Sequence, residues 1–292
     1  MNILIATNVN YLFATKVMLY SLAKNEDCKI NVYLLHSTLQ DSHKKDIDQS
    51  LSQCKNIHIE YINVGPSIFD SLQLYDHLSK ETFYRILAQD LLPQDMERIL
   101  YIDVDLIINH PIDEFYHMSF IENNDEKYFI VAEGPGISFK QFKIYDNIEM
   151  PHNLPYFNAG VMLMNLKQLR QKVVMEDYIQ FIQEHRDRLL YHDQDILNGM
   201  FYQNVKYVDW KIYNRTIIHI HTLEEAKDAQ DHAVIIHYAG KSKPWHKDYE
   251  SFLYDDFWHY GKVIDRKLYY KITLSHHFMN TKKMIRKVIK GN

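Results

Sequence analysis

Short apolar runs alternate with amphipathic stretches along the first third of the chain. The runs are rich in β-branched side chains and have the length of buried strands. Strands are expected at residues 3–7, 30–35, 57–62 and 98–102. Helices are expected at residues 12–24, 41–54 and 81–92, the last of which stops at Pro93. Strand–helix–strand alternation predicts right-handed crossovers and a mostly parallel sheet.

The turn after the first strand lacks the Gly-x-Gly-x-x-Gly pattern that brings a dinucleotide pyrophosphate close to a helix N-terminus. Asn8-Val9-Asn10-Tyr11 stands there instead. Asn8 and Asn10 offer amide groups to a base and Tyr11 offers a ring face, although the same residues also fit a plain turn. The expected fold is α/β, with a Rossmann-like, mostly parallel central sheet flanked by helices.

Two acidic residues, Asp103 and Asp105, follow the fourth strand on either side of Val104. Side chains two positions apart on a strand point to the same face. Where the strand ends, the backbone can also turn, so that both carboxylates reach one cation. Ligands of parallel sheets bind beyond the carboxyl ends of the strands. The pair therefore indicates a cation site, and the competing interpretation is a solvated strand end.

His237 follows a second buried run, at residues 233–236. Two carboxylates and an imidazole suit Mn²⁺ or Mg²⁺ and leave room for the oxygens of a diphosphate. Asp103, Asp105 and His237 are therefore the predicted metal ligands. The alternative for His237 is a packed core histidine.

Composition is that of an ordinary globular protein, with 46% hydrophobic and 24% charged residues among 292. Cys28 and Cys54 have no metal-ligand spacing and are expected to be free thiols in a reducing compartment. The N-terminus lacks the pattern of a secretory leader, and no run approaches the roughly 20 apolar residues of a membrane span. These features predict a cytoplasmic protein.

The last 31 residues differ from the rest in charge. Residues 262–292 carry nine basic residues against one acid, Asp265, whereas the remainder of the chain has a net charge of −13. Apolar positions recur at helical spacing within residues 284–289. We expect a domain over residues 1–255 and a basic amphipathic tail over 256–292 that contacts an anionic membrane surface. Nucleic acid is not an expected partner, because no nucleic-acid motif accompanies the tail. A helix packed on the body is the alternative.

Six blocks occur in an order that resembles the retaining glycosyltransferases of family 8, which include bacterial lipooligosaccharide galactosyltransferases and glycogenins. The resemblance covers the chain from Asn2 to about Trp245. The blocks are Asn10-Tyr11, Phe83-Tyr84-Arg85-Ile86, Leu100 to Asp105, Tyr156 to Asn165, His192 to Asn198, and His237 to Gly240 with Lys243-Pro244-Trp245.

The resemblance implies a GT-A fold and transfer of a hexose, galactose or glucose, from a UDP-sugar to a hydroxyl of a cell-envelope or surface-protein glycan. It implies Mn²⁺ or Mg²⁺ on the UDP diphosphate, and a tail that attaches the protein to the inner face of the cell membrane. The implied donor-binding residues are Thr7, Asn8, Asn10, Tyr11, Arg85, Asp103, Val104, Asp105, Asn158, Ala159, Asp193, Gln194, His237, Gly240 and Lys243. The catalytic residues are Gln194 and Asp193.

Gln194 lies where the resemblance puts the group under the anomeric carbon. A neutral amide is a poor nucleophile, which favours front-face substitution, with Asp193 or Glu133 as the alternative nucleophile or base. Asp193 could instead cap a helix, and Arg85 could pair with Asp90 or Glu81 on its own helix.

Asn8 departs from the Asp that many bacterial members carry, so its carbonyl would accept a uracil N–H without charge assistance. Two other functions remain open: a catalytically silent nucleotide-sugar-binding protein at the membrane and a metal-dependent phosphohydrolase. The phosphohydrolase would need further acidic ligands for a second ion.

Overall fold

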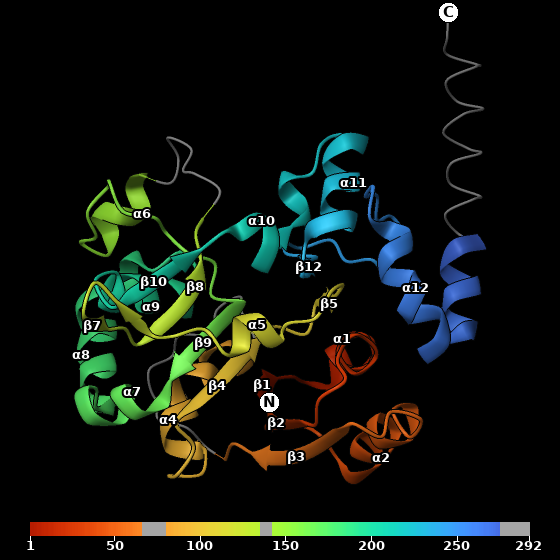
Figure 1. Cartoon of the computed structure of the whole chain (residues 1–292), viewed down its shortest axis with the longest axis horizontal. Helices are drawn as coiled ribbons and strands as arrows, with labels where there is room; N and C mark the ends of the chain where they lie inside the picture. Colours follow the sequence, from red (N-terminus) through yellow and green to blue (C-terminus); the bar gives the residue numbers. More distant parts are fainter. Residues whose placement is uncertain (66–79, 135–141, 275–292) are drawn as a thin grey trace, which may run out of the picture.

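The computed structural model describes residues 1–65, 80–134 and 142–274 (Figure 1). The strands are β1 (Asn2–Ala6), β2 (Ile30–His36), β3 (Ile57–Asn63), β4 (Arg98–Ile102), β5 (Leu106–Ile108), β6 (Ile121–Glu122), β7 (Asp125–Glu126), β8 (Phe129–Ala132), β9 (Val161–Asn165), β10 (Val205–Val208), β11 (Arg215–Thr216) and β12 (Ile235–His237). The α-helices are α1 (Leu12–Asn25), α2 (Asp41–Ser50), α4 (Ala88–Leu91), α5 (Asp113–Tyr116), α6 (Phe142–Asn147), α7 (Leu166–Lys172), α8 (Met175–His185), α9 (Asp193–Phe201), α10 (Trp210–Tyr213), α11 (Leu223–His232) and α12 (Tyr254–Ile264). Short 3₁₀ helices are η1 (Val9–Tyr11), η2 (Lys80–Leu87), η4 (Arg186–Arg188) and η5 (Ile217–His219).

The central sheet has seven strands in the order β10-β8-β9-β4-β1-β2-β3. β1 runs parallel to both β2 and β4, and β2 runs parallel to β3. β9 is the exception, because it lies antiparallel between β4 and β8. The prediction of a mostly parallel sheet flanked by helices is confirmed. The four strands predicted near the N-terminus are also confirmed, each within one residue at either end.

A second sheet of three short strands, β11-β12-β5, lies beside the first. β5 continues the chain just after β4, and β12 pairs with it antiparallel so that His237 is opposite Leu106. β11 pairs parallel with β12, with Thr216 opposite His237. This small sheet therefore joins a segment near residue 106 to segments that come more than a hundred residues later.

The helix expected at residues 81–92 is wrong in detail, because η2 and the short α4 occupy this stretch. Inside η2 the Arg85 side chain bonds the carbonyl of Thr82 and reaches toward the end of β4. Such tertiary contacts outweigh a modest helix propensity. The helix predicted to reach Cys54 ends at Ser50, and α1 matches its prediction within one residue.

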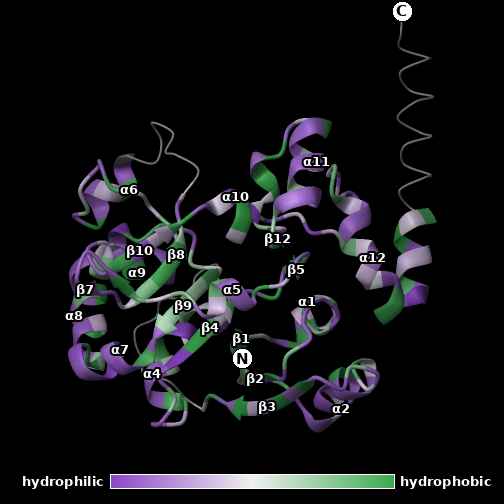
Figure 2. Cartoon of the chain, viewed as in Figure 1, coloured by the Kyte–Doolittle hydropathy of each residue, from purple (hydrophilic) through white to green (hydrophobic). Residues whose placement is uncertain are grey.

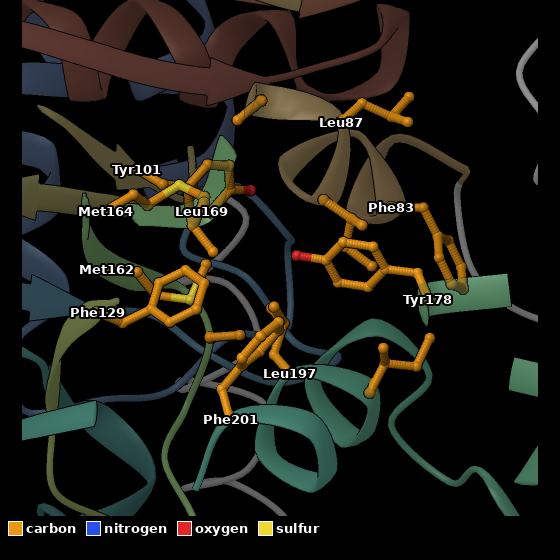
Figure 3. Packing of buried hydrophobic residues seen from close by; sticks show 14 of the residues in the cluster. Phe83, Leu87, Tyr101, Phe129, Met162, Met164, Leu169, Tyr178, Leu197 and Phe201 are labelled. Atoms are coloured by element: carbon orange, nitrogen blue, oxygen red, sulfur yellow. The ribbon is translucent and has the colours of Figure 1, made fainter. Parts of the chain in front are cut away.

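Hydrophobic packing holds α9 against the central sheet. Phe201 of α9 lies 5.2 Å, ring centre to ring centre, from Phe129 of β8, and Leu197 lies in the same cluster (Figure 3). The central strands consist largely of hydrophobic residues, whereas α11 is mostly hydrophilic (Figure 2). Because α9 is fixed by its C-terminal half, its first residues are held at a defined place beside the sheet.

The predicted division at residue 255 falls inside α12. Phe257 and Trp258 of this helix are buried and pack against Phe13 of α1. A further helical stretch at residues 266–274 follows, with Ile272 buried and Tyr269 against Trp258. The first part of the predicted tail is therefore packed on the body, and residues 275–292 lie outside the described residues.

Candidate active site

The two acidic residues after β4 lie in the turn that leads into β5. Asp103 donates its backbone N–H to the carbonyl of Gly160 at 2.8 Å, and the carbonyl of Asp105 accepts the N–H of Tyr238 at 2.9 Å. The turn is therefore tied to β9 on one side and to the end of β12 on the other. Both carboxylates face the same space, as the sequence predicted.

His237 meets these carboxylates because of the strand register. Its partner across β12 and β5 is Leu106, the residue next to Asp105. The Nε2 atom of His237 lies 3.3 Å from Oδ1 of Asp105 and 4.0 Å from Oδ2 of Asp103. One ligand atom from each of the three residues lies within 4.8 Å of the others. In the described part of the chain this is the one such group of acidic, histidine or cysteine side chains.

The charge on Asp105 is balanced by two neighbours. Burial would raise the pKa of its carboxyl, but His237 and the Lys243 ammonium outweigh that effect and hold the pKa below its ordinary value. Lys243 is itself buried, contacts Asp105 Oδ2 and donates to the carbonyl of Tyr238 at 3.0 Å. The donor set of two carboxylates and one imidazole fits a divalent cation.

Arg85 links the Asp103 carboxylate to Asp193. Its Nη2 lies 3.1 Å from Oδ1 of Asp103, and its Nε lies 3.0 Å from Oδ2 of Asp193. Nη1 bonds the carbonyl of Ala159, and the guanidinium lies over the ring of Tyr101, 4.3 Å from its centre. The alternative pairing of Arg85 with Asp90 or Glu81 is wrong, because its carboxylate partners come from other elements.

A cavity of about 280 Å³ opens in front of these groups. It is lined by Ala6, Thr7, Asn8, Tyr11, Glu81, Thr82, Arg85, Tyr101, Asp103, Val104 and Asp105. Seven of the fifteen predicted donor-binding residues are thus in its wall, and Asn10 is exposed outside it. The side-chain Nδ2 of Asn8 donates to Glu81 Oε2 at 3.1 Å. The side-chain Oδ1 of Asn8 accepts the backbone N–H of Asn10 at 2.9 Å.

Asp193 is the first residue of α9 and is buried. The helix cap is His192, with φ at 48°, so the alternative role of Asp193 as the cap is wrong. The N–H of Arg85 Nε is directed at the Thr82 carbonyl, and Asp193 Oδ2 accepts no hydrogen bond from the described residues despite its ion pair. Burial raises the pKa of Asp193 to about 6, against the opposing effect of Arg85.

Neutral amides surround Gln194, the next residue. Its Oε1 accepts the Nδ2–H of Asn158 at 3.0 Å and the backbone N–H of Ala159 at 3.1 Å. Its Nε2 donates to the hydroxyl of Tyr156 at 3.2 Å. Predicted residues Asn158, Ala159 and Gln194 are therefore in direct contact with one another.

Gly160 lies between the cluster of Asp103, Asp105 and His237 and the amide side chains of Asn158 and Gln194. A Cβ there would lie 2.6 Å from both Asp103 Oδ2 and the Cε1 atom of His237, and 2.9 Å from Asn158 Oδ1. No side chain fits in that space without displacing these groups. The close approach of β9 to the acidic turn depends on this glycine.

A family model described as glycosyl transferase family 8 matches residues 2–249 of the chain. The chain belongs to glycosyl transferase family 8. The resemblance inferred from the six sequence blocks is thereby confirmed.

Several relatives of this family 8 glycosyltransferase are known. General stress protein A of Bacillus subtilis is 24% identical over 276 residues, which are 89% of this chain and 92% of that protein. The lipopolysaccharide 1,3-galactosyltransferase of Salmonella typhimurium is 24% identical over 249 residues, 84% of this chain and 73% of that protein. A crystal structure of the galactosyltransferase LgtC with donor and acceptor sugar analogues has a TM-score of 0.76 at 23% identity, and covers 91% of this chain and 96% of that one. This likeness shows the GT-A fold.

Three residues of this glycosyltransferase were missed by the sequence reasoning. Glu81 lines the cavity, Tyr101 donates its hydroxyl to Asp103 Oδ1 at 2.7 Å, and Asn214 bonds both His237 and Asn158. Tyr101 could have been found, since alternation along β4 puts it on the same face as Asp103. Asn214 has no signal in the sequence, because its role depends on the pairing of β11 with β12.

Two predicted residues of the glycosyltransferase, Gly240 and Glu133, are not among the residues that line the cavity. Gly240 is exposed, with φ at +105°, a backbone conformation that favours glycine. Glu133 is exposed just after β8.

Among the described residues, no helix is both long and apolar enough to span a bilayer.

Proposed function

We propose that this glycosyltransferase moves a hexose from UDP-galactose or UDP-glucose, with retention of configuration, to a hydroxyl of a cell-envelope or surface-protein glycan. The observation that carries the proposal is the convergence of Asp103, Asp105 and His237 beside a cavity that Arg85 also lines, where Arg85 joins Asp103 to Asp193, the neighbour of Gln194. The nucleotide diphosphate would need Asp103, Asp105 and His237 with their metal ion, and the sugar would need Asp193 and Gln194. The named relatives, which include a galactosyltransferase of lipopolysaccharide, support a hexose donor.

Asp103, Asp105 and His237 would hold Mn²⁺ or Mg²⁺. The ion would supply Lewis-acid stabilisation of the charge that develops on the leaving diphosphate. Lys243 lies at Asp105 and can turn to a phosphate oxygen, since its ammonium is a mobile point charge on a flexible stem. Arg85 remains cationic, because Asp103 and Asp193 outweigh the effect of burial and raise its pKa.

The base of the nucleotide would occupy the wall formed by Thr7, Asn8 and Tyr11. Tyr11 offers a ring for stacking, and Trp245 supports that ring edge-on at 6.0 Å. The Asn8 side-chain oxygen, which accepts the backbone N–H of Asn10, would also accept the uracil N3–H. Asn8 would therefore bind the base without charge assistance.

The amide contacts of Gln194 support front-face substitution. Both lone pairs of Oε1 are used by the N–H groups of Asn158 and Ala159, which makes this oxygen a weak nucleophile. The acceptor hydroxyl would attack on the face that the UDP leaves, and a leaving-phosphate oxygen would take its proton. Asp193 Oδ2, buried and without a hydrogen bond from the described residues, suits a sugar hydroxyl. Asp193 as nucleophile is the alternative.

The two other functions have less support. A phosphohydrolase with two metal ions needs more acidic ligands than the single group found in the described part of the chain. A catalytically silent binding protein would be favoured by loss of a ligand or a sugar-site residue, whereas the predicted metal, sugar-site and diphosphate residues are all present.

The inner face of the cell membrane is the proposed location, with the basic tail as the attachment. Lys262, Arg266, Lys267 and Lys271 are exposed, and so are Val263, Tyr270 and Leu274. Basic and apolar side chains exposed together favour an anionic lipid surface. The remaining five basic residues of the tail and the residues 284–289 lie outside the described residues.

The test of the function is release of UDP from UDP-galactose and UDP-glucose, with and without Mn²⁺ and a panel of envelope glycans. We expect metal-dependent release that a suitable acceptor accelerates, and a first-formed product with the donor's α configuration in its NMR coupling constant. A β-linked product would overturn retention, and release of UMP and a sugar 1-phosphate in place of UDP would favour the phosphohydrolase.

The attachment is tested by deletion of residues 275–292, which leaves the packed stretch up to Leu274 in place. We expect weaker co-sedimentation with anionic vesicles and unchanged hydrolysis of a UDP-sugar. Each lost basic residue contributes about 1 kcal/mol at most near such a surface. Unchanged co-sedimentation together with a lower melting temperature would instead mean that these residues pack on the body.

A further inference from the structure

Asn214 connects the metal-binding residues to the sugar-binding residues. It follows α10 and precedes β11, and its side chain is buried. Its Oδ1 lies 2.8 Å from Nδ1 of His237, and its Nδ2 donates to Asn158 Oδ1 at 3.0 Å. Asn158 in turn donates to Gln194 at 3.0 Å. A continuous chain of hydrogen bonds therefore runs from a predicted metal ligand to the residue proposed to lie under the anomeric carbon.

Two backbone N–H groups fix the direction of every bond in this chain. The N–H of Gly160 can only donate, and it lies 3.0 Å from Asn158 Oδ1, so this atom is the amide oxygen. The N–H of Ala159 fixes Gln194 Oε1 in the same way, at 3.1 Å. With its oxygen placed, Asn158 turns its NH₂ toward Gln194 and its second lone pair toward Asn214.

The orientation of Asn214 follows from that of Asn158. Its NH₂ faces the Asn158 oxygen, so its own oxygen must face His237. An amide oxygen only accepts, and the Nδ1 atom of His237 must therefore carry a hydrogen. When the ring is neutral, the lone pair is then on Nε2, the atom that faces Asp103 and Asp105.

We propose that Asn214 is a positioning residue that keeps His237 in the tautomer able to bind a metal through Nε2, and that it aligns Asn158 and Gln194 with the same side chain. Outer hydrogen-bond partners of metal-binding histidines usually fix the ring in this manner, and their loss lowers metal affinity or activity about 10- to 100-fold. The proposal rests on the proposed metal-dependent function. The side-chain amide of Asn214 would thus fix the orientation of the metal ligand His237 and of the sugar-site residues Asn158 and Gln194.

The first experiment uses ¹⁵N NMR of metal-free protein, at a pH where the His237 imidazole carries a single proton, to find which ring nitrogen holds that proton. A His237→Gln variant identifies the signals among those of 17 histidines. We expect the proton on Nδ1 in the wild type and a shift toward Nε2 in Asn214→Ala. A proton on Nε2 in the wild type, or no change in the variant, would overturn the proposal.

The second experiment measures Mn²⁺ affinity by electron paramagnetic resonance. We expect Asn214→Ala to weaken Mn²⁺ binding about 10- to 100-fold. Asn109→Ala is the matched control, because Asn109 bonds the carbonyls of Gln230 and Ala233 next to the small sheet and should leave the affinity unchanged. Wild-type protein that binds no Mn²⁺ would refute the proposed metal site, while the NMR result would still decide the role of Asn214.

The Asn214→Asp variant separates the two halves of the proposal. Its carboxylate still accepts from His237 Nδ1 but cannot donate to Asn158. We expect wild-type Mn²⁺ affinity and tautomer with a lower kcat, because Asn158 and Gln194 lose their alignment. This variant also keeps the proposal testable if Asn214→Ala does not fold. An affinity as low as that of Asn214→Ala, or an unchanged kcat, would contradict it.

Discussion

The proposed metal end of the site, at Asp103, Asp105 and His237, and the proposed sugar end, at Asn158 and Gln194, meet at Gly160 but are held by different interactions. At the metal end, carboxylates are balanced by Lys243 and Arg85. At the sugar end, neutral amides are oriented by backbone N–H groups. Buried charges make large and mutually dependent contributions to the free energy of unfolding, whereas each neutral hydrogen bond contributes about 1 kcal/mol.

This difference suits the two tasks of the site. A diphosphate changes its charge during transfer, and fixed charges around it act strongly where water is excluded. A sugar ring is neutral, so the site has to hold it in one orientation and has no charge to neutralise. Oriented amides can do this without attracting ions. Asp193 brings a carboxylate to the sugar end, and it lies next to Arg85.

The largest expected effect is at the metal end. We expect Asp103→Ala and Asp105→Ala each to abolish UDP release and Mn²⁺ binding, since either change removes a ligand. They should differ in stability, because Asp105→Ala also leaves the buried Lys243 without its carboxylate, at a cost of about 3–5 kcal/mol. Mn²⁺ titration and urea unfolding measure both quantities. Folded variants with normal kinetics would remove the metal site from the proposal.

Gly160→Ala tests whether both ends depend on one close approach. The added Cβ would lie within 3.0 Å of Asp103, His237 and Asn158, so we expect weaker Mn²⁺ binding and lower kcat together. Gly199→Ala, a matched change against Phe181, should affect stability alone. If Gly160→Ala changed only one of the two quantities, the ends would be independent.

Gln194→Ala tests the sugar end alone. It removes the acceptor for Asn158 and Ala159 and the donor to Tyr156, so we expect transfer to fall by about 10²-fold with unchanged Mn²⁺ affinity, roughly 2.7 kcal/mol in barrier height. Single-turnover kinetics and Mn²⁺ titration provide the two readings. A parallel loss of metal affinity would contradict the separation of the ends.

The last expected effect is a pH dependence of stability, which leaves the catalytic groups of the metal end untouched. The pKa of Asp193 is raised from 3.8 to about 6 in the folded protein, so its ionisation destabilises the fold as the pH rises through this range. Relative to wild type, Asp193→Asn should therefore gain stability between about pH 4 and 6, by about 3 kcal/mol at most, and the gain should stay constant above that. Urea unfolding at several pH values, with Asp187→Asn as the surface control, checks this. A gain that appears on lowering the pH would contradict the sign.

Local patterns predicted the elements near the N-terminus well. The strands β1, β2 and β4 are largely apolar runs, so their burial follows from nearby residues, whereas β3 alternates with polar residues and has no buried position. The positions of Asp103, Asp105 and His237 were predicted from strand ends and from the family resemblance. Their contact, however, depends on the register of β12 against β5, which no local pattern specifies.

Other features depended on tertiary contacts that the sequence does not contain in a local form. The helix expected over residues 81–92 became η2 and α4 because Arg85 is held by groups on other elements. Asp193 was expected as a possible cap, but His192 takes that position in a conformation rare for a residue with a side chain. Asn214 joins the site only through the packing of the small sheet.

The small sheet has a consequence for synthesis of the chain. β5 leaves the ribosome soon after Asp105, but its partner β12, with His237, is made much later. A nascent or prematurely terminated chain can therefore contain all the parallel strands of the central sheet and still lack one of the three predicted metal ligands. Incomplete molecules would not consume activated sugar, and a chain that ends at residue 230 should fail to bind Mn²⁺ in a titration.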